Sequence, residues 1–271
     1  MNAREFLTNL TIISVTMGLS AFVELALPLF TPTPAQRAHR TVNLGLTGVT
    51  LAVNWALNWT AAVVALALSL QAPGLMTRLG VPLAAQIVVG FVVIDFSFGY
   101  LAHRAMHMSP TLWRAHRIHH SDPFVDVTTT FRNHPIEGVW RFLFIVIPVW
   151  ILGLPAEAVV LQRLLTVING GLEHANIRLW PPLDRALSLV WVTPNMHKVH
   201  HSRDSVETNS NYGNILSIYD RILRTFTPTE RAFSVVYGLD DVDPLHANSL
   251  TELLAMPFQV VESETIPEIS A

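Results

Sequence analysis

Eight of the twelve histidines lie in three short clusters. The clusters read His103-Arg-Ala-Met-His107, His116-Arg-Ile-His119-His120 and His197-Lys-Val-His200-His201. Side chains three or four residues apart share one face of a helix, and neutral imidazole is the commonest metal ligand in proteins. Three such faces offer more nitrogens than one metal ion accepts. The spacing therefore predicts a two-metal centre held almost wholly by histidine, and so an enzyme.

Two simpler interpretations are weaker. Histidines scattered over a surface would rarely produce two H-x-x-H-H boxes in one chain. A structural zinc site normally takes four ligands, often including cysteine, so eight histidines are excessive for it. All-nitrogen ligation suits zinc, copper, iron or nickel, and spacing alone does not choose among them. Two metals beside a lipid phase favour oxygen activation on apolar substrates over hydrolysis.

Four further histidines lie outside these boxes. His174, in Asn169-Gly-Gly-Leu-Glu-His174, follows an apolar stretch on the side of the boxes and is a candidate ligand. His134, directly before Pro135, is a second candidate, and its alternative role is to orient a turn. His39 and His246 have no clustered partner, so we expect both on the surface.

Carboxylates should support the ligands, because metal-bound histidine usually donates its second N–H to a carboxylate or a carbonyl. The candidates for this role are Asp95, Asp122, Asp204 and Glu173. Asp95 precedes His103 by just over two helical turns. An acid near a membrane boundary is costly unless it is paired. Nothing in the sequence ties Glu24 to the site.

The composition is that of a membrane protein. Of 271 residues, 51% are hydrophobic and 14% are charged, whereas soluble proteins carry about 25% charged residues. The net charge of -3 argues against nucleic-acid binding. Because the chain has no cysteine, disulfides, thiolate sites and iron–sulfur clusters are excluded.

Apolar runs predict an all-α membrane bundle of about four to five spans. A membrane helix needs roughly 20 apolar residues, and no charged residue lies between Arg40 and Arg78. The predicted spans are Leu7–Leu29, Val42–Leu70, Val81–Leu101 and Val139–Ile168, the last broken at Gly153-Leu-Pro155 into a hairpin. The N-terminus lacks the pattern of a cleaved signal peptide.

The loops predict an orientation. Arg37, Arg40 and the arginine-rich histidine segment fall on one side of the predicted bundle, and basic loops favour the cytoplasm. We therefore expect a helical cap, carrying the metal site, on the cytoplasmic face. The predicted organisation is transmembrane helices at 1–102, a catalytic region at 103–228 that includes a membrane hairpin at 139–170, and a soluble tail at 229–271. That tail holds eight acidic residues and one arginine.

The order H-x3-H, H-x2-H-H, H-x2-H-H resembles the fatty acid hydroxylase/sterol desaturase superfamily of membrane di-iron oxygenases. The resemblance covers about Val92–Phe226. Further matches are Asp95 before Tyr100 and His103-Arg104, then Trp113, Phe131-Arg-Asn-His-Pro135, Thr193-Pro194, Asn211-Tyr-Gly213 and Asp220-Arg221. One departure is Arg224, since the family often has glycine in a D-R-x-x-G-T pattern.

The resemblance implies two irons held by the box histidines, with His174 as a further ligand. It also implies O2 as co-substrate, an apolar lipid as substrate and a separate electron-donor protein. Lipid hydroxylation, desaturation and ether cleavage stay open, as does the identity of the lipid. A metal transporter or storage protein is the alternative of another class. It is weakened because Glu24 is the only ionisable residue in the first two predicted spans.

Overall fold

Helices form every regular element of residues 3–69, 74–243 and 245–259, the part of the chain that the computed structural model describes. Two isolated β-bridges, Pro28 with Ile177 and Trp191 with Leu216, are the only β pairing in these ranges. The all-α prediction is therefore confirmed for the described residues.

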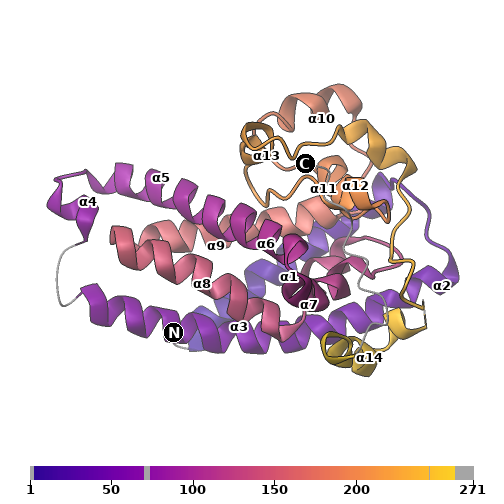
Figure 1. The fold of residues 1–271 in the computed structure, drawn as a ribbon, viewed down its shortest axis with the longest axis horizontal. Helices are drawn as coiled ribbons and strands as arrows, with labels where there is room; N and C mark the ends of the chain where they lie inside the picture. The colour runs from indigo at the N-terminus through magenta and orange to yellow at the C-terminus, as the bar shows by residue number, and fades with distance from the viewer. Residues whose placement is uncertain (1–2, 70–73, 244, 260–271) are drawn as a thin grey trace.

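Long helices form one end of the molecule (Figure 1). They are α1 (Ala3–Ala26), α3 (His39–Ser69), α5 (Leu83–Ile94), α8 (Pro135–Leu152) and α9 (Ala156–His174). Helix α9 packs against α1 and α5, and α8 packs against α3. The predicted break in the fourth apolar run is present, because Gly153 ends α8 with a φ of 60° and α9 begins after Pro155. Gly153 also lies against Gly74, where a Cβ would be 2.2 Å from the Gly74 Cα.

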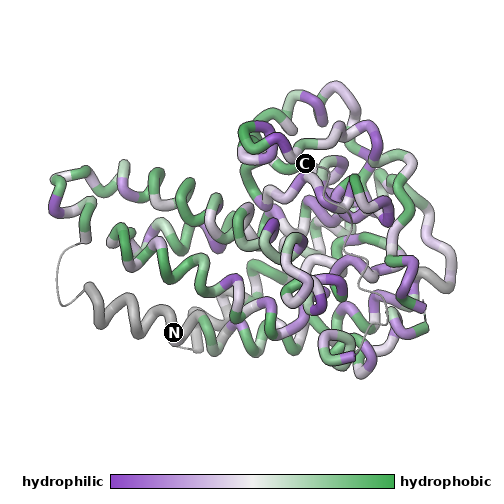
Figure 2. Tube along the Cα trace, in the orientation of Figure 1, coloured by the Kyte–Doolittle hydropathy of each residue, from purple (hydrophilic) through white to green (hydrophobic). Residues whose placement is uncertain are grey.

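Two described helices are long and apolar enough to cross a membrane. They are Leu83–Met108, with 26 residues, and Pro135–Leu152, with 18, and a shorter apolar helix is Leu10–Ala26. Figure 2 shows the end formed by α5, α8 and α9 as mostly hydrophobic. Apolar side chains such as Val88, Trp150 and Val160 are more than 60% exposed, as expected of a surface that contacts lipid. Leu70, the last residue of the predicted second span, and residues 260–271 of the predicted tail lie outside the described residues.

A π-helical segment interrupts the Leu83–Met108 helix just before the first histidine box. It is η1 (Asp95–Leu101), and α6 (Ala102–Met108) follows without a break. Such segments are rare and often lie at functional sites. A Cβ on Gly99 would lie 2.9 Å from Asp95 Oδ1 and 3.0 Å from Asn214 Cβ, so glycine permits a close approach here. The loop around Asn214 thereby comes to lie against the helix that carries His103.

Short helices make up the other end of the molecule (Figure 1). They are α2 (Pro34–Arg37), α7 (Pro110–His120), η2 (Val127–Phe131), α10 (Pro181–Leu187), α11 (Pro194–His200), α12 (Ser205–Thr208), α13 (Ile218–Ile222), η3 (Thr229–Ser234), η4 (His246–Asn248), α14 (Leu250–Ala255) and η5 (Met256–Phe258). At the opposite end, α4 (Leu75–Arg78) precedes α5. The described part of the C-terminal segment contacts the rest of the fold, because Leu253 and Met256 pack against Leu46 and Ile118.

Candidate metal centre

Nine histidines form two adjoining buried clusters. We call them the five-histidine cluster and the four-histidine cluster. In each, the candidate ligand atoms lie within 4.8 Å of one another. The five-histidine cluster contains His103, His107, His116, His120 and His200, and the four-histidine cluster contains His119, His174, His197 and His201. The structure thus brings together all eight box histidines and His174.

Four helices present these rings. The end of the Leu83–Met108 helix carries the first box, α7 carries the second, α11 carries the third, and His174 is the last residue of α9. Helix α7 begins with Pro110 and α11 with Pro194, each at the first helical position, where the missing N–H costs no hydrogen bond. Each H-x-x-H-H box supplies ligands to both clusters, because its residues turn along one helix face.

The ring tautomers of the five-histidine cluster follow from its hydrogen bonds. Nδ1 of His103 lies 2.8 Å from the Tyr212 carbonyl, and Nδ1 of His200 lies 2.7 Å from the Ser210 carbonyl. A carbonyl only accepts, so each Nδ1 carries the proton and each neutral ring has a bare Nε2. These two Nε2 atoms lie 3.0 Å apart.

Two facing lone pairs repel each other, so this arrangement calls for a cation between them. Nitrogens bound about 2.1 Å from a metal ion at right angles are about 3.0 Å apart. Nε2 of His116 also lies 3.0 Å from Nε2 of His103. Both ring nitrogens of His107 and the Nε2 of His120 are buried with no hydrogen-bond partner among the described residues. The residues therefore fit a metal ion.

The four-histidine cluster repeats the pattern. Nδ1 of His174 donates to the Gly170 carbonyl at 2.8 Å, which leaves its Nε2 bare. That Nε2 lies 3.1 Å from Nε2 of His119 and 3.0 Å from Nε2 of His197. Nε2 of His201 is 3.2 Å from Nε2 of His197. A second metal ion fits here for the same reason.

Burial favours the neutral form of five of these rings, in both clusters. It lowers the pKa of His119, His120, His197 and His201 well below 6.5, and neighbouring imidazoles lower it further. Burial likewise lowers the pKa of His200 to about 3. Neutral imidazole is the form that binds metal, so both clusters are prepared for it at neutral pH.

Glu137 is a supporting carboxylate that sequence reasoning missed. Its Oε2 lies 2.9 Å from Nδ1 of His116, and both side chains are buried. It stands in the first turn of α8, directly after the Phe131–Pro135 motif. Its place two residues after that motif was the available signal.

None of the four predicted supporting carboxylates makes a comparable hydrogen bond to a cluster histidine. Asp95 accepts from the Leu216 N–H at 3.1 Å, and so fixes the loop that carries the Tyr212 carbonyl. Glu173 comes nearest to a ligand, since its Oε1 lies 3.8 Å from Nδ1 of His174. Asp204 is exposed and caps α12 through the Val206 and Glu207 amides.

Asp122 instead belongs to a buried polar network beside α7. It lies 2.8 Å from Nδ1 of His39 and accepts from Asn43 and Thr129 at 2.8 Å. The expectation of a surface position is therefore wrong for His39, which is fully buried between Asp122 and Asp126. His246 is exposed, as expected.

His134 lies outside both clusters. Its Nδ1 accepts from the Ile136 N–H at 3.2 Å, which caps α8, and its Nε2 lies 3.3 Å from the Leu254 carbonyl. The ring therefore orients the turn before Pro135, which is the alternative role weighed for it.

Two buried cations brace the backbone around the ligands. Lys198, inside the third box, donates to the carbonyl of His174 and to the carbonyl of Val125. Arg132, also fully buried, donates from Nε to the Ile118 carbonyl at 2.8 Å. Glu24 performs a similar task from α1, since its Oε1 accepts from the amides of Val127 and Asn176 at 2.7 and 2.8 Å. These contacts join segments far apart in sequence, which spacing cannot reveal.

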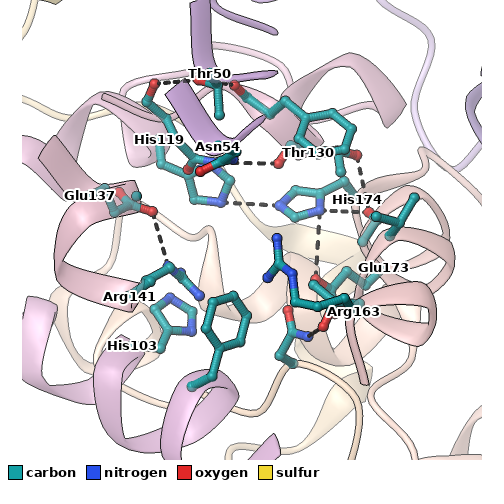
Figure 3. A pocket seen from close by; sticks show the side chains of 18 of the residues that line it. Thr50, Asn54, His103, His119, Thr130, Glu137, Arg141, Arg163, Glu173 and His174 are labelled. Carbon is teal, nitrogen blue, oxygen red and sulfur yellow. Dashed lines mark hydrogen bonds and ion pairs between the residues drawn. The ribbon is translucent and has the colours of Figure 1, made fainter. Parts of the chain in front are cut away.

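A cavity of about 950 Å³, counted with its open mouth, adjoins the clusters (Figure 3). His119, His174 and His197 of the four-histidine cluster line it, whereas His103 is the one residue of the five-histidine cluster that does. Its apolar walls come from Leu57, Phe98, Phe142, Ile145 and Val167 on α3, η1, α8 and α9. The cavity thus links the histidines to the apolar end of the molecule.

Comparison with known sequences shows which protein family the chain matches. The family model described as fatty acid hydroxylase matches residues 87–225, half of the chain, and this range includes both clusters. Ornithine lipid hydroxylase OlsE of Rhizobium tropici is 36% identical over 159 residues, which are 58% of this chain and 46% of that protein. No solved structure matches the chain.

Two further relatives are more distant. Alkylglycerol monooxygenase of Caenorhabditis elegans is 29% identical over 147 residues, which are 54% of this chain and 28% of that protein. Very-long-chain aldehyde decarbonylase CER1 of Arabidopsis thaliana is 27% identical over 183 residues, which are 64% of this chain and 28% of that protein. The chain thus spans less than half the length of these curated relatives.

Proposed function

Because the chain belongs to the fatty acid hydroxylase family, we propose that it hydroxylates an unactivated C–H bond of a lipid, with O2 as co-substrate and two non-haem iron ions as cofactor. The observation that carries this proposal is the pair of clusters whose bare Nε2 atoms face one another beside an apolar-walled cavity. When bound, two irons would supply the redox chemistry that activates O2 for C–H oxidation.

The ligand assignment follows the two clusters. The five-histidine cluster would hold one iron and the four-histidine cluster the other, with His134 left out of the set. Backbone carbonyls keep the Nδ1 protons of His103, His200 and His174 in place, so each Nε2 stays aimed inward. Fixing the ring orientation in this way raises metal affinity.

The cavity walls bind the substrate and exclude water. Phe98, Phe142 and Ile145 offer an apolar surface between α8, α9 and η1. An acyl chain entering from the lipid phase would replace water there. The reacting carbon would then lie beside His119, His174 and His197.

The proposal includes a membrane topology and a partner. We assign residues 1–102 to membrane helices, 103–228 to the catalytic region with its hairpin at 139–170, and 229–271 to an acidic tail. The chain would be multi-pass, with the metal site facing the cytoplasm. The two candidate spans and the basic loops support this topology. Electrons would come from a separate protein.

The alternatives have less support. The relatives described above carry hydroxylase, monooxygenase and decarbonylase names, and none is named as a desaturase or a metal transporter. Desaturation would begin with the same C–H oxidation, so the product decides between the two reactions.

Labelled oxygen tests the proposal. Membranes containing the protein, its reductant and lipid are exposed to ¹⁸O2, and the lipids are analysed by mass spectrometry. We expect one ¹⁸O atom in a hydroxylated lipid, with none in membranes that carry His119→Ala and full incorporation with His246→Ala. A product that lacks two hydrogens and carries no label would replace hydroxylation with desaturation. Full turnover by His119→Ala would refute the metal-site assignment.

A further inference from the structure

Two arginines reach into the cavity from the apolar hairpin. Arg141 comes from α8 and Arg163 from α9, and Figure 3 shows their guanidinium groups directed into the same space as His119 and His174. A charged side chain within a membrane helix is costly and commonly marks a functional site. Each charge therefore needs a partner.

Arg141 has such a partner. Its Nε lies 3.3 Å from Oε1 of Glu137, one helical turn earlier on α8. The same carboxylate holds Nδ1 of His116 through its other oxygen. Arg141 is thus paired with the carboxylate that orients His116 in the five-histidine cluster.

Arg163 has no hydrogen bond or ion pair with any residue that the structure describes. Its guanidinium lies over the ring of Phe98, 4.8 Å from the centroid, a contact that uses none of its five N–H donors. The other acid of the cavity, Glu173, accepts from Asn169 at 2.9 Å and lies beside His174. Arg163 is therefore the cavity arginine that has no ionic partner among the described residues.

We propose that Arg163, with Arg141 beside it, binds an anionic group of the lipid substrate. Guanidinium pairs with carboxylate and phosphate through parallel N–H···O bonds, so the ligand carries one of these groups. The inference rests on the proposed function and narrows its substrate class to acidic lipids. Because the arginines and the histidines line one cavity, the oxidised carbon lies near the charged end of the lipid.

Equilibrium binding tests this without turnover. The iron-loaded protein in neutral detergent is titrated with three lipids that share two oleoyl chains: phosphatidate, diacylglycerol hemisuccinate and diacylglycerol. We expect the wild type to bind at least one acidic lipid about tenfold or more tighter than diacylglycerol. Arg163→Gln should lose about ten- to a hundredfold in affinity for that lipid, as for other charged hydrogen bonds. Its affinity for diacylglycerol and its iron content should stay unchanged.

Two further variants complete the design. Arg163→Lys keeps the charge without the planar fork, so it should retain part of the preference. If Arg163→Gln loses iron, the lipid preference of Arg163→Lys becomes the test of the anion site. Arg185→Gln, which removes an exposed arginine of α10, should bind all three lipids as the wild type does.

The outcomes distinguish a phosphate ligand from a carboxylate ligand, and the anion-site proposal from the hydroxylase proposal. A preference for phosphatidate indicates a phosphate ligand, and one for the hemisuccinate indicates a carboxylate. Equal wild-type affinity for charged and neutral lipids, or an Arg163→Gln variant that keeps the preference, overturns the anion site. If the preference depends on Arg163 but no lipid takes up ¹⁸O, the anion site stands and the hydroxylase proposal fails.

Discussion

The five-histidine and four-histidine clusters differ in what surrounds them. In the former, Glu137 backs His116 and the Thr208 hydroxyl lies 3.2 Å from Nδ1 of His120. Only one of its five rings reaches the cavity, whereas three of the four rings of the other cluster do. Closed coordination is typical of structural metal sites, and catalytic sites keep a position open. The four-histidine cluster is therefore the side on which we expect substrate and O2 to react.

Removing one ligand from each cluster tests this difference most strongly. His197→Ala and His107→Ala should each lower the iron content from two ions toward one per chain. Activity should fall by more than the roughly hundredfold typical for loss of an outer-shell partner. His197→Ala should also abolish any O2 consumption measured in the absence of lipid, because His197 lines the cavity and would hold the iron of that side. Metal analysis and oxygen uptake measure both effects. Loss of both irons from either variant would show that the clusters bind as one unit.

Lowering the pH should affect the two clusters alike. Burial lowers the pKa of His119 and His201 in one cluster, and of His120 and His200 in the other. These histidines therefore bind more protons in the unfolded chain than in the folded chain below pH 6.5, so their contribution to stability is lost as pH falls from 6.5. The stability lost is at most about 1.4 kcal/mol per histidine for each pH unit.

Thermal unfolding of the metal-free protein between pH 8 and pH 5 measures this loss. The iron-loaded protein should resist it until its iron leaves, and both irons should leave over the same pH range. A metal-free protein whose melting temperature stays constant over this range would contradict the neutral-ring assignment.

Glu137 supports one cluster only. Glu137→Ala should lower the iron affinity of the five-histidine cluster by about ten- to a hundredfold, because Nδ1 of His116 loses its partner. The four-histidine cluster should keep its iron. Glu137→Gln can still accept a hydrogen bond from Nδ1 of His116, so its iron affinity should lie between those of Glu137→Ala and the wild type. Competition with a chelator measures the two affinities. Equal weakening of both sites would mean that Glu137 acts through the fold rather than through His116.

The sequence predicted which histidines come together better than it predicted the groups that orient them. Box histidines reveal themselves because their spacing follows one helix. Partners such as the Tyr212 and Ser210 carbonyls carry no side-chain signal, and their contacts join residues far apart in the chain. His134 and Asp204 have the right chemistry, but each caps a helix start. Those roles depend on where α8 and α12 begin, which residue spacing does not fix.

The departure at Arg224 has a structural explanation that bears on the five-histidine cluster. Arg224 has a φ of 59°, a conformation that favours glycine, and its side chain is exposed. The turn is held because the Thr225 N–H donates to the Asp220 carbonyl at 2.8 Å. The Asp220 carboxylate in turn accepts from the amides of Tyr212 and Gly213, each at 2.8 Å. The strained turn thus helps to position Asp220, which holds the segment whose Tyr212 carbonyl orients His103.

Arg224→Gly should relieve this strain and raise the free energy of unfolding by roughly 1 kcal/mol, less the added freedom of glycine in the unfolded chain. Iron content and turnover should not change, since the variant preserves the hydrogen bonds of Asp220. Thermal unfolding and metal analysis of the paired proteins measure both. Arg224→Ala is the matched control, because it removes the same side chain but keeps a Cβ, and it should give little or no gain. A loss of one iron in Arg224→Gly would show that the five-histidine cluster depends on the rigidity of this turn.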